Sequence, residues 1–146
     1  MNDLPTKRDI ANSLVGGTLC FLSAVFLSSF VDLLLEQILL YFGISGVTAF
    51  ESFSIAKAII FFALVHLICG FISGLYTGYV TEKGVKITLF ITGQIGFIGF
   101  FIYMTLLSKV YFVGHYYLEV ISLPLLGNIL GAYLGGYTIR WKSREE

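Results

Sequence analysis

The stretch GFISGLYTGYV, residues Gly70 to Val80, places three glycines four residues apart inside an apolar run. Glycine costs roughly 1 kcal/mol relative to alanine in the interior of a helix, so three in one stripe need a physical reason. In lipid, helices associate through close packing and a few hydrogen bonds, and small residues let two backbones approach. The stripe therefore predicts a membrane-spanning helix that packs closely against another helix.

The composition of the whole chain also indicates a membrane protein. Of its 146 residues, 57% are hydrophobic and only 12% are charged, which is too little charge to cover a soluble domain of this size. The formal net charge is zero, so no basic surplus indicates nucleic-acid binding. We therefore expect an integral membrane protein in contact with the lipid bilayer, without a nucleic-acid partner.

Four stretches of the sequence reach the about 20 apolar residues that a membrane-spanning helix needs. They lie near residues 12–31, 54–80, 87–107 and 117–139, with an outer extension at 32–53. The connection TEKGVK between the second and third stretches is so short that these two spans should be antiparallel neighbours. The sequence predicts one all-α integral membrane domain over residues 1–146, a four-transmembrane-helix bundle.

The distribution of basic residues predicts the orientation of this bundle. Two of the nine, Lys57 and Lys109, lie in the segments that precede the second and fourth spans. The other seven lie in the N-terminus, the short second connection and the C-terminus: Lys7, Arg8, Lys83, Lys86, Arg140, Lys142 and Arg144. Because cytoplasmic loops carry an excess of lysine and arginine, both termini are expected to be cytoplasmic, in a multi-pass protein of the cell membrane.

Nearly the same glycine pattern returns in the fourth span. GFISGLYTGYVTEK aligns without gaps with GNILGAYLGGYTIR, which pairs Gly70 with Gly127 and Lys83 with Arg140. The first and third spans share small residues at every third position: Gly17, Cys20 and Ser23 in one, Gly93, Gly96 and Gly99 in the other. We interpret the unit as a helical hairpin used twice, in a parallel repeat, although glycine-rich spans can also converge.

The glycines are candidate helix-packing residues. Packing between spans of one chain is the simpler interpretation, and a pore or an oligomer interface lined by glycine is the alternative. The candidate positions are Gly70, Gly74, Gly78, Gly127, Gly131, Gly135, Gly17, Gly93 and Gly96.

Three polar residues lie well inside the apolar spans, where polar groups are costly and are the first functional candidates. They are His66, Gln94 and Asn128, and we expect them to form one hydrogen-bond network between helices. A path for protons or a solute through His66 is the alternative, because histidine can titrate near neutral pH.

The outer extension is the part of the chain that has no counterpart in the second hairpin. Asp32 and Glu36 share one helix face there, and Lys57 follows at the start of the second span. They are either solvated charges at the headgroups or an outer vestibule that attracts cations. The first helix is expected either to run past the outer membrane surface or to bend and lie along it.

The sequence lacks the motifs of the common catalytic and metal sites. His66 and His115 are far apart, and Cys20 and Cys69 both lie in apolar runs, where small packing residues are expected. There is no phosphate-binding loop and no serine beside a base. We expect no enzyme activity, no metal and no cofactor, although an intramembrane active site is a third hypothesis.

The strings GFISGLYTGYVTEKG and GNILGAYLGGYTIR resemble the ends of the second and fourth spans in small, glycine-rich, four-span membrane proteins of prokaryotes whose function is unknown. The resemblance covers most of the chain in layout, but its specific motif is confined to these two ends. It implies a four-span architecture and an inner-membrane location, and it implies no activity. The extension at 32–53 departs from that layout.

From these features we expect a non-catalytic small membrane protein that packs through its glycine stripes with itself or with a larger membrane complex. The alternative is a small oligomeric channel or transporter for an ion or a small solute.

Overall fold

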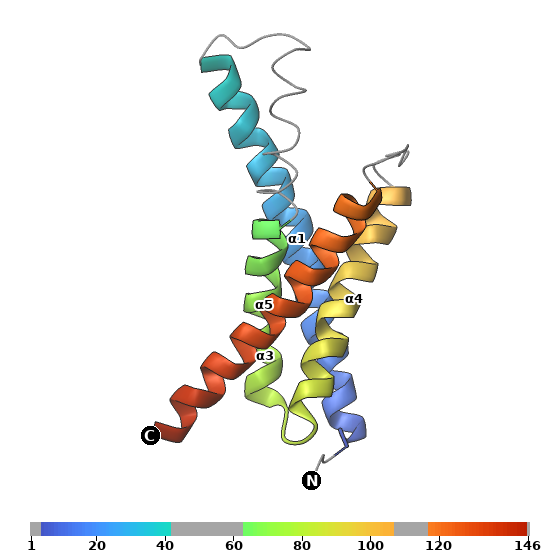
Figure 1. Cartoon of the computed structure of the whole chain (residues 1–146), viewed down its shortest axis with the longest axis vertical. Coiled ribbons are helices and arrows are strands. Elements are labelled where there is room, and N and C mark those ends of the chain that lie inside the picture. Colours follow the sequence, from blue (N-terminus) through green and yellow to red (C-terminus); the bar gives the residue numbers. More distant parts are fainter. Residues whose placement is uncertain (1–3, 42–62, 107–116, 146) are drawn as a thin grey trace.

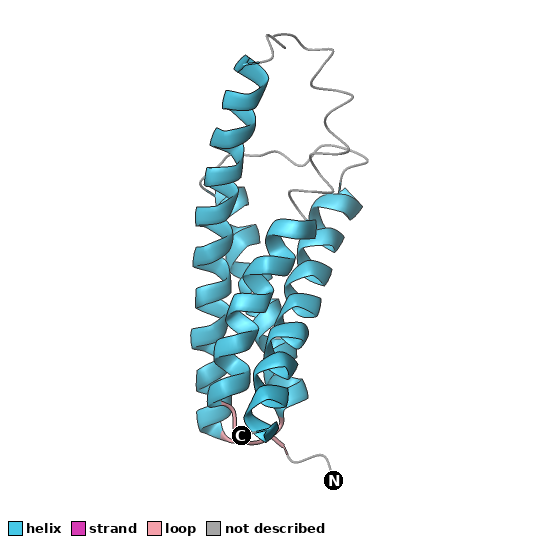
Figure 2. Ribbon diagram, turned by 90° about the vertical axis from the view of Figure 1, so that its left-hand side faces the viewer, coloured by secondary structure: helices cyan, strands magenta, loops and turns pink. Residues whose placement is uncertain are grey.

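The structure of the chain, a computed structural model, describes residues 4–41, 63–106 and 117–145. These residues form four helices and no strand: α1 (Lys7–Tyr41), α3 (His66–Val80), α4 (Val85–Leu106) and α5 (Tyr117–Glu145). The helices run side by side as one bundle (Figures 1 and 2). The predicted all-helical fold class is thus confirmed for the described residues.

Within the described part of the chain, three helical segments are long and apolar enough to cross a membrane: Lys7–Val31, Ala63–Val80 and Val85–Leu106. α5 is longer than a span requires, but it is not one of these three segments. Large apolar side chains point outward from the bundle, such as Phe26 (82% exposed) and Leu106 (73% exposed). This exterior suits a lipid environment, and the fourth crossing stays a prediction.

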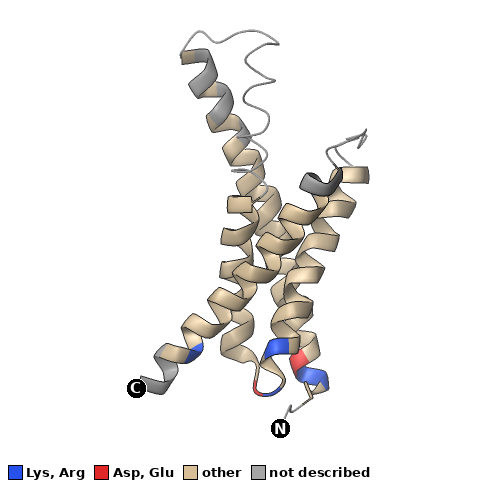
Figure 3. Cartoon of the chain, viewed as in Figure 1, with Lys and Arg blue, Asp and Glu red and all other residues tan. Residues whose placement is uncertain are grey.

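The packing of the helices follows a simple order. α1 packs on α4 and α3, and α5 packs on α3 and α4, with the most extensive contact between α3 and α5. α5 crosses α3 obliquely, and both described chain ends lie at the same end of the bundle as the α3–α4 turn (Figure 1). We call this the charged end, because the charged residues that Figure 3 colours on the ribbon lie there.

The α3–α4 turn at the charged end is tight. Gly84 has a φ of 61°, in the left-handed region where a side chain is strained. The carbonyl oxygen of Gly84 accepts hydrogen bonds from the backbone N–H groups of Ile87 (2.9 Å) and Thr88 (3.0 Å), which starts α4. A β-carbon on Gly84 would lie 2.6 Å from the backbone nitrogen of Pro5, so the N-terminal segment packs directly on this turn.

The first helix continues past residue 31, where the first span was predicted to end. α1 is a single helix of 35 residues, about 52 Å long at 1.5 Å per residue, against a hydrocarbon core of about 30 Å. Over residues 32–41 it continues away from the bundle instead of folding back, as the cyan end of α1 in Figure 1 shows. The rest of the predicted extension, residues 42–53, lies outside the described residues.

Candidate functional site

The glycines of α3 lie directly against the backbone of α5. A β-carbon added to Gly74 would stand 2.7 Å from the Cα atom of Ala132, and one on Gly78 would stand 2.5 Å from the Cα atom of Gly136. For Gly70 the distance to the Cα atom of Asn128 would be 2.9 Å. Real β-carbons essentially never approach so closely, so the two helices touch through their main chains.

The glycines of α5 face α3 in the same way. A β-carbon on Gly131 would lie 2.7 Å from the backbone nitrogen of Phe71, and one on Gly135 would lie 2.8 Å from that of Leu75. One on Gly127 would lie 3.1 Å from Cβ of His66. The small residues of each helix therefore pack against the main chain of the other helix.

These contacts are reciprocal, in a register that the sequence repeat does not give. Gly70 faces Asn128 while Gly131 faces Leu67, and Gly74 faces Ala132 in the same manner as Gly135 faces Phe71. The contacts therefore exchange when Gly70 is paired with Gly131, one helical turn away from the alignment of Gly70 with Gly127. The helices pack in a different register from the one in which the two sequences align, so this packing does not support a duplication. The duplication stays a prediction.

The remaining candidate glycines also face helices of the same chain. Gly17 of α1 lies against Ile95 of α4, and Gly96 of α4 lies against Cys20 of α1. Gly93 of α4 faces α5, where its β-carbon would be 2.8 Å from the Cα atom of Ile129. All nine candidate glycines are buried within the chain. A second chain cannot touch them unless the bundle opens.

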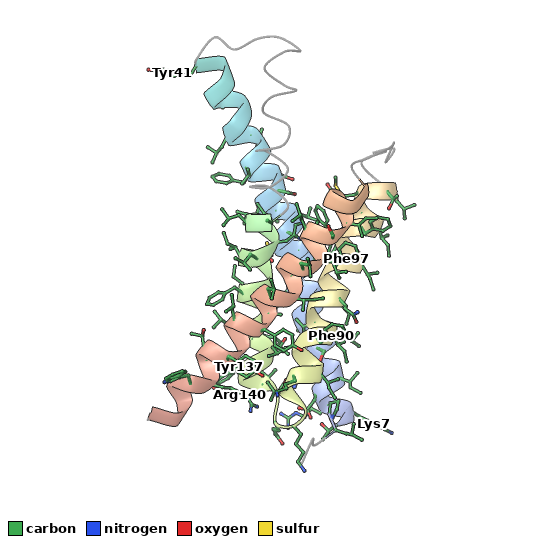
Figure 4. The ribbon with its side chains drawn as sticks, in the orientation of Figure 1. Lys7, Tyr41, Phe90, Phe97, Tyr137 and Arg140 are labelled. Atoms are coloured by element: carbon green, nitrogen blue, oxygen red, sulfur yellow. The ribbon has the colours of Figure 1, made fainter. Side chains whose placement is uncertain are left out.

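His66 and Asn128 come together at the upper part of the α3–α5 contact. Both side chains are fully buried, and Nδ1 of His66 lies 3.1 Å from the Asn128 amide. In the amide orientation that satisfies both residues, the Asn128 nitrogen donates to His66 Nδ1 and to the His66 carbonyl oxygen. The Asn128 side-chain oxygen accepts from the backbone N–H of Phe97 at 3.1 Å. Phe97 belongs to α4 and is labelled in Figure 4. Asn128 thus joins three helices.

The other ring nitrogen of His66 has no hydrogen-bond partner among the described residues. The ring stands edge-on to Phe100, with 4.5 Å between the ring centroids. A second buried polar pair lies nearer the charged end, where the hydroxyls of Thr77 and Thr92 are 3.1 Å apart. Gly16 of α1 leaves room for this pair, since its β-carbon would be 3.2 Å from Cγ2 of Thr92.

Gln94, the third member of the predicted polar network, is not part of it in the structure. Its side chain is half-buried, and His66 and Asn128 bond each other and the backbone but not Gln94. The inward face of α4 carries Thr92 and Gly96, and a residue two positions from each of them lies on another face of the helix. The predicted network therefore joins two of its three residues.

The candidate outer vestibule lies mostly outside the described part of the chain. Asp32 and Glu36 lie on the part of α1 that continues past residue 31, and only their backbone is described. Lys57 lies outside the described residues.

A polar cluster at the charged end was not singled out from the sequence. Asp9 is 1% exposed, and one of its oxygens accepts from the backbone N–H (2.9 Å) and the hydroxyl (2.6 Å) of Thr6. The Thr6 hydroxyl in turn accepts from the backbone N–H of Asp9 at 3.2 Å, which caps the start of α1. The other oxygen of Asp9 accepts from the backbone N–H of Glu82 at 3.0 Å. The signal was present as Thr-x-x-Asp before an apolar run.

Two further side chains hold the end of α3. Asn12 of α1 donates from its amide to the carbonyl oxygen of Val80 at 3.2 Å. Arg140 of α5 donates from Nε to the carbonyl oxygen of Gly78 at 3.2 Å, and from Nη2 to that of Thr81. The carbonyls of Gly78 and Val80 belong to the last turn of α3, where helix carbonyls lack partners within the helix, and that of Thr81 belongs to its C-cap. The α3–α4 turn is therefore held by α1 and by α5.

Replacing Asp9 with asparagine should destabilise the bundle by about 1–2 kcal/mol, because the change removes a charged cap and weakens bonds to two segments. The free energy of unfolding, measured by titrating the detergent-solubilised protein with a denaturing detergent, checks this. Glu82→Gln is the matched control: its exposed ion pair with Arg8, at 3.7 Å, should contribute less than about 1 kcal/mol. Equal losses in the two variants would contradict the role given to Asp9.

Comparisons with protein-family models, with curated proteins and with solved structures find no match to this chain. The resemblance to glycine-rich four-span proteins stays a prediction, and function is argued from the chain itself.

Proposed function

We propose that the chain is a non-catalytic integral membrane protein of the cell membrane, built as a four-span bundle with both termini in the cytoplasm. In this proposal the glycine stripes build the bundle, and the apolar exterior packs against further copies or against a larger membrane complex. The observation that supports this proposal most is the backbone contact between α3 and α5, because it buries both glycine stripes inside one chain.

The fourth crossing and the orientation have separate support. α5 runs obliquely to α3 but in the same direction, toward the charged end (Figure 1), so it crosses the same layer if α3 does. The charged residues coloured on the ribbon lie where α1 begins, where α3 turns into α4 and toward the end of α5 (Figure 3). An excess of lysine and arginine on short segments at one end favours a cytoplasmic location for that end.

The state of the buried polar groups favours a non-catalytic role. Asn128, Thr77 and Thr92 are each 0% exposed and hydrogen-bonded to residues of the chain. A catalytic site or an ion path needs polar groups that substrate or water can reach. These side chains instead join the helices, which is the common use of polar residues between helices in membranes.

A small oligomeric channel or transporter is the second candidate, and one observation favours it. His66 is 0% exposed and its Nε2 has no hydrogen-bond partner among the described residues, an arrangement that costs free energy. In a transporter, this nitrogen would gain a partner when the helices separate.

Two measurements on one purified preparation distinguish the two candidate functions. The protein purified in mild detergent should form an assembly of fixed stoichiometry, and the same protein in liposomes should give no ion or solute flux above empty liposomes. Flux that disappears in both His66→Leu and Asn128→Leu would overturn the non-catalytic proposal in favour of transport. A lone monomer without flux would remove the assembly role.

A further inference from the structure

The charged end of the bundle exposes lysines from three separate segments. Lys7 begins α1, Lys83 lies in the α3–α4 turn and Lys86 lies in the first turn of α4, and all three are exposed. We call them the basic face. Glu82 pairs with Arg8, and none of the three lysines has an acidic partner among the described residues.

The acidic groups at this end are occupied elsewhere. Asp9 is buried, and both of its oxygens accept hydrogen bonds from Thr6 and Glu82. The Glu82 carboxylate is exposed and lies 3.7 Å from Arg8. The basic face is therefore a surface of uncompensated positive charge among the described residues, and it suits an anionic partner.

The segment that carries two of these lysines is held in place before any partner binds. Asp9 and Asn12 of α1 bond the chain at Glu82 and Val80, and Arg140 of α5 bonds it at Thr81. A surface that is already ordered loses less conformational entropy on binding than a free loop does.

Exposed aromatic side chains mark the level of the basic face in a bilayer. Tyr79 at the end of α3 is 78% exposed, and on α5 Tyr137 is 47% and Trp141 is 73% exposed. Tyrosine and tryptophan are enriched at the depth of the lipid headgroups. Figure 4 labels Tyr137 and Arg140 on the lower part of α5 and Lys7 at the lower end of α1. The lysines therefore lie near the height of lipid phosphates.

We propose that the basic face binds the headgroups of anionic phospholipids, with Lys83 and Lys86 as its principal contacts. The inference rests on the membrane location proposed above and adds a lipid class to it. Charge complementarity is its basis: the surface is cationic, lies at headgroup depth and faces the leaflet in which anionic lipids give a negative surface potential.

The test uses the full chain in mild detergent with equal amounts of phosphatidylglycerol and phosphatidylcholine, and counts retained lipids by native mass spectrometry. The wild-type protein should retain phosphatidylglycerol preferentially. Lys83→Gln/Lys86→Gln should lower this preference about five-fold for each lysine removed. The matched control, Lys57→Gln/Lys109→Gln, changes two lysines that the sequence places at the opposite side and should keep the preference.

Four results would overturn the inference. They are equal retention of the two lipids by the wild type, an unchanged preference in Lys83→Gln/Lys86→Gln, an equal loss in the control variant, and full displacement of the lipid by inorganic phosphate. The last would indicate a site for free phosphate. Extraction of membranes with alkaline carbonate separates this inference from the function proposed above. Release of the chain by carbonate contradicts the membrane location itself, whereas retention without lipid preference contradicts only the lipid site.

Discussion

Replacing Gly74 with alanine should destabilise the bundle by about 2 kcal/mol, even though alanine is the better helix former by roughly 1 kcal/mol. The added β-carbon would stand 2.7 Å from the Cα atom of Ala132 and 2.8 Å from its carbonyl carbon. These are backbone atoms, so α3 and α5 must separate along their contact. The free energy of unfolding in mixed micelles, followed by circular dichroism, measures the effect.

Gly99→Ala is the matched control for this prediction. The three atoms nearest to its β-carbon would be Cγ, Cβ and Cδ2 of Phe21, at 3.0–3.2 Å, so the neighbouring helix must give by only a few tenths of an ångström. Because the gain in helix propensity then remains, Gly99→Ala should be neutral or slightly stabilising. A Gly74→Ala protein as stable as the wild type would show that the α3–α5 backbones are not in contact.

Replacing Asn128 with leucine should cost about 1–2 kcal/mol, the second large effect. The leucine has nearly the same size but leaves the fully buried His66 without its hydrogen-bond partner. A buried polar group that loses its partner keeps the whole cost of its desolvation. The same unfolding titration measures this loss.

The double variant His66→Phe/Asn128→Leu provides the control. Because both partners are then apolar, much of the stability should return, and the coupling energy of the double-mutant cycle should lie near 0.6–1.7 kcal/mol. Losses that simply add in the double variant would contradict a direct bond between the two side chains.

The sequence predicted the helical class and the charged end, since both depend on composition and on short-range pattern. An apolar run with glycines four apart indicates a packed helix whatever its partner, and TEKG is too short to separate α3 from α4. The first helix was expected either to run past the outer membrane surface or to bend along it, and α1 continues as one helix to Tyr41, because helix formation follows local propensity and not the thickness of a membrane.

The residues of the candidate site were predicted unevenly, for reasons of geometry. His66 and Asn128 were paired correctly because each lies beside a glycine stripe, and the stripes face each other. Gln94 was included for its polarity alone, and its position on α4 turns it away. Asp9 precedes the apolar run, so it is not among the polar residues inside the spans. The pattern Thr-x-x-Asp does predict its cap with Thr6. Its bond to Glu82 joins residues 73 positions apart. A contact between residues so far apart depends on how the helices pack, which the local pattern of one amino-acid sequence does not give.

The central claim is that the glycines of α3 and α5 face each other within one chain. Nuclear Overhauser contacts between the α-protons of Gly74 and Ala132 test it most directly, in labelled protein diluted into an excess of unlabelled protein in detergent micelles. We expect the contact to persist undiminished on dilution, because both residues belong to the same molecule. A contact that disappears on dilution, or that is absent from the undiluted sample, would contradict it.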